Sequence, residues 1–349
     1  MILILPCAGE SSRFPGLRPK WMLTQPDGNL MACDAIAKIN LKNVEKIVLV
    51  VLSKHIKDFK DSIVDAFKKA NIKKPVEIFE LSQKTKSQPE TVSEYLKTLS
   101  EDTPFFIKDC DGQFECEIKP KNQIITADVS LIKGLNVGTK SYCNVNDLGM
   151  VTTIVEKQVI SRNFCAGGYS FASSKKFLSS YEKIKSYDNL YVSHIIDHMM
   201  LFDNESFSNK ASSSYEDWGT VEDWLAYKST FATFFVDIDG VLVKNSSEFM
   251  DPRWGQSKPL TENVEYIKRL KSTGRIQLIL TTARTEKFSA DTEKQLKDIG
   301  IDYDKILYGM LHAKRIIIND HSNSNPYPSC EAFSVQRDDD NLKNLRITK

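Results

Sequence analysis

The chain alternates between short runs of apolar residues and longer stretches in which apolar residues recur every three or four positions. Strand-like runs lie at residues 2–6, 46–52, 76–81, 105–108 and 150–156. Helical patterns lie between some of them, at residues 56–70 and 90–99. Short continuous apolar runs are typical of strands that helices cover on both faces. The alternation predicts an α/β fold with a mostly parallel open sheet.

A second series of the same kind begins near residue 230. Its expected elements are a strand at 231–236, a helix at 261–272, a strand at 276–280, a helix at 290–299 and a strand at 315–318. The Ser- and Asn-rich residues 204–215 are expected to form an exposed loop, followed by a short helix at 221–227. We therefore expect two Rossmann-like three-layer domains, residues 1–228 and a small capless domain at 230–349.

Composition narrows the class of protein. The 349 residues include 47 basic and 46 acidic side chains, so the net charge is +1 and gives no general attraction to nucleic acid or to anionic membranes. No apolar run approaches the roughly 18 residues that span a bilayer, so no membrane span is expected. The seven cysteines are scattered without C-x-x-C spacing, as expected of reduced thiols in a cytoplasmic protein.

The first apolar run leads into a polar loop that suits a phosphate group. The string LPCAGESSRFPGLRPKWML contains Gly9, Ser11, Ser12, Arg13 and, further on, Lys20. Backbone N–H groups of such a loop can donate to phosphate oxygens, and the two basic side chains add positive charge. The string resembles the nucleotidyltransferases that activate sugar-1-phosphates and phosphocholine-like phosphates, with the pattern L-x-x-A-G-x-x-x-R-F and then P-K. The ESS tripeptide departs from the more glycine-rich loop of many relatives.

Further matches to this family follow in order over residues 1–228, and the resemblance implies their roles. Gln88 would lie near the base and ribose, Asp109 or Asp111 would be the first metal ligand, and Asp217 the second. Glu156 and Lys157 would lie at the acceptor phosphate, with Gly168 on the strand that follows. The implied residues of this half are Gly9, Ser11, Ser12, Arg13, Lys20, Gln88, Asp109, Asp111, Glu156, Lys157, Gly168 and Asp217.

The implied reaction is attack by an acceptor phosphate oxygen on the α-phosphate of a nucleoside triphosphate, with release of pyrophosphate. Mg²⁺ would bridge the phosphates. Purely structural roles of the same residues stay open. Asp111 and Gly112 could form a turn, Glu156 and Lys157 could be a surface ion pair, and Asp217 could cap the helix that follows.

The sharpest motif of the chain is FFVDIDGVLV at residues 234–243. Asp237 and Asp239 are two residues apart in an extended segment, so both carboxylates can face one site. The motif resembles the D-x-D-G signature of haloacid dehalogenase-superfamily phosphatases. The resemblance implies that the first aspartate attacks phosphorus and the second acts as general acid and base. It also implies phosphoryl binding by Thr282, neutralisation by Lys314, and Mg²⁺ held by Asp320 with Asp237 and Asp239.

These motifs together predict a bifunctional enzyme. The N-terminal domain would use a nucleoside triphosphate and a phosphorylated sugar, alditol or choline-like acceptor. The C-terminal domain would hydrolyse a phosphomonoester. Both reactions would belong to the synthesis of a surface polysaccharide. CTP is the favoured nucleotide, because the N-terminal string resembles cytidylyl enzymes. Two alternatives remain: one domain is catalytic and the other only binds or scaffolds, or the N-terminal domain is a nucleotide sensor.

Overall fold

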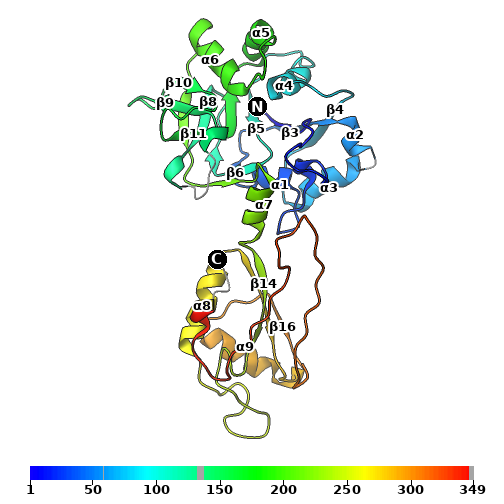
Figure 1. Ribbon diagram of the computed structural model, residues 1–349, viewed down its shortest axis with the longest axis vertical. Coiled ribbons are helices and arrows are strands. Elements are labelled where there is room, and N and C mark those ends of the chain that lie inside the picture. Colours follow the sequence, from blue (N-terminus) through cyan, green and yellow to red (C-terminus); the bar gives the residue numbers. More distant parts are fainter. Residues whose placement is uncertain (58, 132–136, 346–349) are drawn as a thin grey trace. The chain divides into compact units, whose positions relative to one another are not determined.

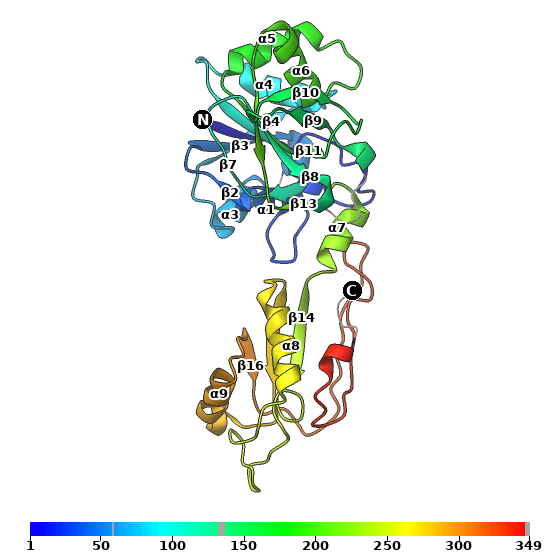
Figure 2. The same ribbon diagram turned by 90° about the vertical axis from the view of Figure 1, so that its left-hand side faces the viewer.

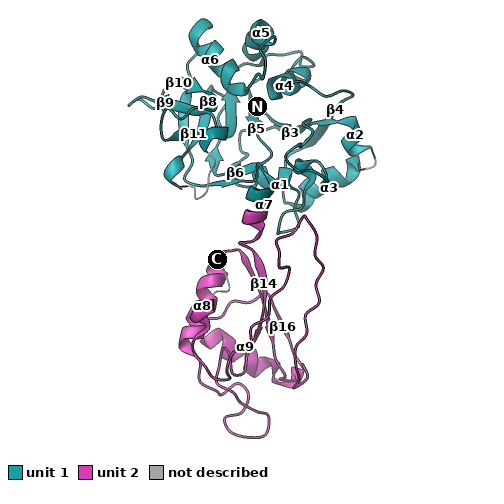
Figure 3. Ribbon diagram, in the orientation of Figure 1, with its two compact units in different colours: residues 1–224 teal, residues 225–349 magenta. Residues whose placement is uncertain are grey.

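The computed structural model describes residues 1–57, 59–131 and 137–345. The chain divides into two compact units, Met1–Trp224 and Leu225–Lys349 (Figure 3). The division falls within helix α7 (Val221–Lys228), whereas the sequence suggested a boundary just after this helix. Among the helices of these described residues, none is long and apolar enough to cross a membrane.

Unit 1 is built on a mixed sheet that has nine strands in the described part of the chain (Figure 1). These strands are β1 (Ile2–Pro6), β3 (Lys46–Leu52), β4 (Val76–Leu81), β5 (Phe105–Lys108), β8 (Gln123–Asp128), β9 (Tyr142–Val145), β10 (Val151–Val155), β11 (Asn163–Phe171) and β12 (Ser208–Ala211). The path is β10-β9-β11-β5-β1-β3-β4, with β8 beside β11 and β12 beside β8. Strands β1, β3, β4 and β5 are parallel, whereas β11 is antiparallel to β5 and β8.

Successive residues of the central strands enter two different cores, as expected for a sheet covered on both faces. Leu3 and Leu5 of β1 belong to one buried cluster, and Ile2 and Ile4 to the other. Helices α1 (Met31–Ala37) and α3 (Lys60–Lys69) contribute to the first cluster. Helices α4 (Gln88–Leu96), α5 (Ser174–Ile184) and α6 (Val192–Phe202) contribute to the second and lie together in Figure 1. Unit 1 therefore has the predicted three-layer α/β structure, but the expectation of a mostly parallel sheet was wrong, because β11 pairs antiparallel with β5, β8 and β9 and β9 with β10.

Two local expectations for unit 1 were wrong. The single helix expected at 56–70 is replaced by α2 (Ser53–Ile56) and α3, and residue 58 between them lies outside the described residues. The expected loop at 204–215 contains β12, which pairs in parallel with β8. Polar residues can form this strand because β8 and the segment at Gly149–Met150 supply partners for its backbone, while its side chains stay partly exposed.

Two small strand pairs complete unit 1. Strand β2 (Ile39–Asn40) pairs with β7 (Cys116–Glu117), and β6 (Gly112–Phe114) pairs antiparallel with β13 (Tyr215–Asp217). The second pair brings together segments about one hundred residues apart in the chain. It places Asp217 opposite Gly112, beside the end of β5.

Unit 2 contains the parallel sheet β14-β15-β16, formed by β14 (Ala232–Asp237), β15 (Ile276–Thr281) and β16 (Lys305–Leu307). Helices α8 (Thr261–Ser272) and α9 (Ser289–Asp298) contribute to one buried cluster with Leu278 and Leu280. Phe235, on the other face of β14, remains 50% exposed. The expected third layer is therefore not present in the part of unit 2 that the structure describes.

The strand expected at residues 315–318 was also wrong. This segment has no regular secondary structure and is drawn as irregular coil in Figures 1 and 2. Ile316 and Ile318 are 75% and 93% exposed. A run of β-branched residues becomes a strand only when a neighbouring strand satisfies its backbone, and here β14 forms the edge of its sheet.

Candidate active site

The polar site of unit 1 is assembled just beyond the carboxyl ends of β1 and β5. The loop after β1 supplies Arg13 and Lys20, and the segment after β5 supplies Asp111. Lys20 Nζ lies 2.5 Å from Asp111 Oδ2, and Arg13 Nη2 lies 3.8 Å from the same oxygen. The two strands are adjacent and parallel, so their ends bring the two loops together.

Asp217 joins this site through the β13–β6 pair. A Cβ atom built on Gly219 would lie 3.1 Å from Asp217 Oδ1, 3.6 Å from Arg13 Nη1 and 3.7 Å from Asp111 Oδ2. Both carboxylates and the guanidinium therefore converge around one glycine. The backbone N–H of Gly219 also donates to Asp217 Oδ1 at 3.1 Å, which fixes the orientation of this carboxylate.

Lys140 is a fourth charged group of the site, and the sequence motifs did not indicate it. Its Nζ lies 2.7 Å from Asp217 Oδ2 and donates to the hydroxyl of Tyr215 at 3.0 Å. The side chains of Lys140 and Asp217 are only 18% and 17% exposed. Each of the two converging carboxylates thus has its own lysine, Lys20 for Asp111 and Lys140 for Asp217.

The charges of this cluster shift its protonation equilibria. Burial opposes ionisation of Asp111, but Lys20, Lys140 and Arg13 outweigh it and hold the pKa of Asp111 below its ordinary range. Burial likewise opposes protonation of Lys140, yet Tyr215, Asp217 and Asp111 raise its pKa. The lowered pKa of Asp111 and the raised pKa of Lys140 both favour the charged forms of these two side chains at neutral pH.

Asp109 has a different environment from Asp111. Its Oδ1 accepts a hydrogen bond from Gln88 Nε2 at 2.5 Å, and its backbone N–H donates to the Gly167 carbonyl at 2.8 Å. Burial and the nearby Asp111 charge raise the pKa of Asp109. Between the two alternatives for the first metal ligand, the geometry therefore favours Asp111, which faces Asp217.

The donor set fits a hard cation such as Mg²⁺. Oxygen atoms of one or two carboxylates, completed by water and substrate phosphates, are a usual environment of protein-bound Mg²⁺. Asp111 and Asp217 supply two such carboxylates. No group of three or more His, Cys, Asp or Glu side chains in the described residues is arranged to hold a metal ion. Substrate phosphates would thus have to complete the coordination.

The remaining loop residues have an open environment. Gly9 has no atom within 4 Å of a built Cβ, and Ser12 is exposed. Ser11 adopts a left-handed backbone, with φ of 52°, and its Oγ accepts from the backbone N–H of Lys20 at 2.9 Å. This contact closes the loop on itself and leaves Gly9 and Ser12 accessible to a ligand.

The residues predicted at the acceptor side lie on and beside β10 and β11. Glu156 accepts from Ser193 Oγ at 2.7 Å and from Ser141 Oγ. Lys157 Nζ contacts the hydroxyl of Tyr191 and lies 4.4 Å from its ring centroid.

A backbone hydrogen bond and a close packing contact relate these residues to the rest of the unit. The backbone N–H of Lys157 donates to the carbonyl of Lys140 at 3.1 Å. The predicted acceptor lysine is therefore hydrogen-bonded to the same residue that forms the ion pair with Asp217. Gly168 has a packing reason to be glycine, because a Cβ there would lie 2.5 Å from the Phe114 ring.

The second polar cluster lies at the carboxyl ends of β14 and β15 in unit 2. Asp237 ends β14 opposite Thr281. Asp239, two residues on, accepts two hydrogen bonds at 2.8 Å from Arg284 and one at 2.8 Å from Ser246 Oγ. Thr282 Oγ1 is 3.4 Å from Asp239 Oδ2.

Arg284 organises this second cluster and was not among the predicted residues. Its side chain is fully buried and also donates to Thr292 and Gln295 of α9. Burial and the Asp239 charge raise the pKa of Asp237, and Arg315 opposes that rise. The buried Arg284 thus fixes Asp239, while Asp237 remains the less satisfied carboxylate.

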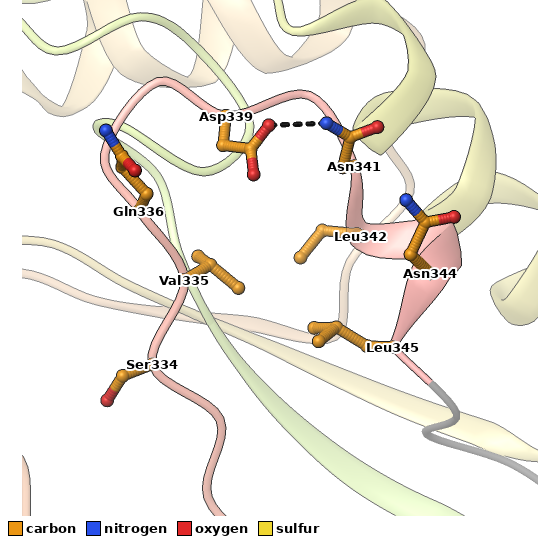
Figure 4. A pocket seen from close by; sticks show the side chains of 8 residues that line it. All are labelled: Ser334, Val335, Gln336, Asp339, Asn341, Leu342, Asn344 and Leu345. Atoms are coloured by element: carbon orange, nitrogen blue, oxygen red, sulfur yellow. Dashed lines mark hydrogen bonds between the residues drawn. The ribbon is translucent and has the colours of Figure 1, made fainter.

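Two predicted residues of unit 2 lie outside this cluster. Lys314 and Asp320 are exposed and belong to the irregular segment that was expected to be a strand. A hollow elsewhere in unit 2 contains none of the predicted residues either. Figure 4 shows its lining by Ser334, Val335, Gln336, Asp339, Asn341, Leu342, Asn344 and Leu345.

Comparison with known proteins identifies the fold of the N-terminal region. A nucleoside-diphosphate-sugar pyrophosphorylase from Vibrio cholerae RC9 matches 65% of this chain and 99% of its own, with 19% identity and a TM-score of 0.53. A UDP-glucose pyrophosphorylase solved with UDP-glucose matches 65% of this chain and 96% of its own, with 13% identity and a TM-score of 0.50. No protein-family model and no curated protein matches the chain. The N-terminal region therefore has the fold of nucleotidyltransferases that handle sugar nucleotides.

Proposed function

We propose that unit 1 transfers a nucleotidyl group from a nucleoside triphosphate to a phosphorylated sugar, alditol or choline-like acceptor and releases pyrophosphate. The observation that carries this proposal is the convergence of Arg13, Lys20, Asp111 and Asp217 at the ends of β1 and β5. The nucleotidyltransferase-like fold of this region supports it. We favour CTP, because the N-terminal string resembles that of cytidylyl enzymes.

In this reaction, an oxygen of the acceptor phosphate attacks the α-phosphorus, and the bond from that phosphorus to the pyrophosphate oxygen breaks. Arg13 and Lys20 neutralise charge on the α-phosphate and on the departing pyrophosphate. Lys157 holds the acceptor phosphate in line for attack. Asp111 and Asp217 would hold Mg²⁺, which when bound reduces the repulsion between the phosphates.

We propose a second activity for unit 2, hydrolysis of a phosphomonoester. A carboxylate oxygen of Asp237 attacks phosphorus, and the bond to the alcohol oxygen breaks as Asp239 donates a proton to it. Water then attacks phosphorus as Asp239 takes a proton from it, and the bond between phosphorus and the Asp237 oxygen breaks; phosphate leaves, the Asp237 carboxylate is regenerated and Asp239 is protonated again. The two-residue spacing at a sheet end and the buried Arg284 that holds Asp239 support this proposal.

The phosphatase proposal further requires residues 315–318 to pair with the edge of β14. That pairing would bring Lys314 and Asp320 to the two aspartates, where Lys314 would neutralise phosphate and Asp320 would complete a Mg²⁺ site. Exposed Ile316 and Ile318 would also become buried. Hydrogen exchange of the backbone amides of 315–318 tests this: pairing protects them, and rapid exchange contradicts it.

Reciprocal substitutions test both activities in one protein. Asp217→Asn is expected to reduce pyrophosphate release at least about 100-fold and leave phosphate release from an aryl phosphate unchanged. Asp237→Asn is expected to abolish phosphate release and leave pyrophosphate release unchanged. A panel of triphosphates, led by CTP, with phosphorylated acceptors and Mg²⁺ provides the first assay.

The matched control is Asp65→Asn, which removes an exposed carboxylate paired with Lys68 at 2.9 Å and should change neither rate. Stoichiometric triphosphate binding without pyrophosphate release from any acceptor would refute the transferase and favour a nucleotide sensor. If the unmodified protein shows only one of the two activities, this result would favour the alternative in which the unit without activity serves as a scaffold.

A further inference from the structure

Lys140 is a charged residue beside Asp217 that the reaction described above does not use. Its ammonium group lies 2.7 Å from Asp217 Oδ2, in the space where a cation bound by that carboxylate would lie. The pair is more than four-fifths buried on both sides. An ion pair shielded from water to this extent is stronger than a surface pair, so any cation that binds Asp217 has to compete with Lys140.

Tyr215 is a second partner of the Lys140 ammonium group, independent of Asp217. The Tyr215 hydroxyl accepts from Lys140 Nζ at 3.0 Å, and the ring centroid lies 5.4 Å from that nitrogen. The four-carbon stem of lysine lets its ammonium move by several Å while the backbone stays in place.

Lys140 connects the Asp217 side of the site with the residues predicted at the acceptor phosphate. Its carbonyl accepts from the N–H of Lys157, the predicted acceptor lysine, while its side chain faces Asp217. Ser141, the next residue, contacts Glu156. A cation at this position is suited to neutralise the α-phosphate as the acceptor phosphate approaches it.

We propose that Lys140 is a further substrate-binding residue of unit 1: it neutralises Asp217 before substrates bind, and its ammonium moves to the α-phosphate of the nucleoside triphosphate when Asp217 takes a divalent cation. This inference rests on the proposed nucleotidyltransferase function. It explains why a site built to bind a cation already holds a lysine against one of its carboxylates. Two positive charges cannot both remain in contact with Asp217 without strong repulsion, whereas the triphosphate offers new anionic partners.

The test uses the full-length protein and two independent measurements. Binding of Mn²⁺ alone, followed by electron paramagnetic resonance without nucleotide, reports the competition at Asp217. Lys140→Met is expected to tighten Mn²⁺ binding at least about fivefold, because it leaves an unpaired, mostly buried carboxylate. The same change is expected to lower kcat/KM for pyrophosphate release about 100-fold. Unchanged or weaker Mn²⁺ binding, or an unchanged kcat/KM, overturns the proposal.

Two further variants separate this role from a structural one. Lys140→Arg keeps a cation beside Asp217, so its Mn²⁺ affinity should not exceed that of the unmodified protein. Tighter binding by this variant would contradict the proposal. Lys183→Met removes the similar Lys183–Asp203 ion pair on the surface and should alter neither measurement. If Lys140→Met does not fold, the Arg variant and Tyr215→Phe, which should lower kcat/KM with Mn²⁺ binding unchanged, keep the proposal testable.

The two measurements also separate failure of this inference from failure of the proposed function. If the unmodified protein releases no pyrophosphate with any triphosphate and acceptor, the function is wrong, yet the Mn²⁺ comparison still measures the competition between Lys140 and a metal at Asp217. If the unmodified protein is active and Lys140→Met behaves like it, only the role of Lys140 is wrong.

Discussion

At the scale of single residues, Asp34 is a buried carboxyl group outside the two polar clusters. It lies in α1 and is 5% exposed, and its Oδ1 accepts from Asn29 Nδ2 at 3.1 Å. Burial, with a smaller contribution from Asp27, raises the pKa of Asp34 to about 7. Folding therefore favours the protonated form of this carboxyl, whereas an unfolded aspartate ionises near pH 4.

This shift predicts a pH-dependent stability. The unfolded chain binds fewer protons at Asp34 than the folded chain between about pH 4 and pH 7, so the contribution of Asp34 to stability falls as pH rises through that window. Asp34→Asn removes the charge and keeps an acceptor for Asn29. It is expected to raise the free energy of unfolding at pH 8 by up to about 4 kcal/mol, and by little at pH 4.

Denaturant melts at the two pH values measure this difference. The control is Asp65→Asn, which affects an exposed carboxylate on α3 and should shift stability by less than about 0.5 kcal/mol. An Asp34→Asn protein that is less stable than the unmodified chain at pH 8 would contradict the argument.

At the scale of secondary-structure elements, a bulge in β11 positions Asp109. The register of β11 against β8 shifts between Cys165 and Gly168. Within this bulge Gly167 has φ of +80°, and a Cβ on it would lie 2.5 Å from Asp109 Oδ2 and 2.9 Å from Asp109 Cβ. Only glycine allows both this backbone conformation and the close approach of the carboxylate.

Gly167→Ala is therefore expected to destabilise unit 1 by about 3 kcal/mol and to reduce pyrophosphate release, because Asp109 has to move away from Gln88. Gly149→Ala is the matched control, since Gly149 also has positive φ, +73°, but no atom lies within 4 Å of its built Cβ. It should cost only about 1 kcal/mol and leave the rate unchanged. Equal losses in the two variants would show that the contact with Asp109 has no special cost.

At the scale of the whole molecule, each unit has buried clusters of its own. Two clusters are drawn entirely from unit 1, and the third entirely from unit 2. Trp224, at the end of unit 1, is 1% exposed, and its Nε1 donates to Gln25 Oε1 at 2.9 Å. Helix α7 is thus required by unit 1 even though it continues into unit 2.

Truncation tests this organisation. A protein of residues 1–228 should fold with a cooperative thermal transition and keep pyrophosphate release, because it retains both cores of unit 1 and Trp224. A protein of residues 1–220 lacks Trp224 and should be less stable by about 3–5 kcal/mol. Circular dichroism melts compare the two. An unfolded 1–228 protein, or equal stability of the two fragments, would contradict this account.

Much of the fold followed from local pattern. The apolar runs at residues 2–6, 46–52 and 105–108 became buried strands of a three-layer unit, because strands covered on both faces are apolar at successive positions. The pattern failed at 204–215 and 315–318. Residues 208–211 form a strand because β8 lies beside them, whereas residues 315–318 have no neighbouring strand in the described part of the chain and form none. The local composition does not encode whether another strand is adjacent.

The sequence by itself determined the types of chemistry, since Arg13, Lys20, Asp111 and Asp217 could be named from motifs at strand ends. Only the tertiary structure decided which of these groups meet: it turned Asp109 toward Gln88, placed Asp111 beside Asp217, and brought Lys140 and Arg284 to the two clusters. The physical reason is that a motif records residues adjacent in the chain. The pairing of charges depends on long-range contacts, such as that of β13 with β6, between segments about one hundred residues apart.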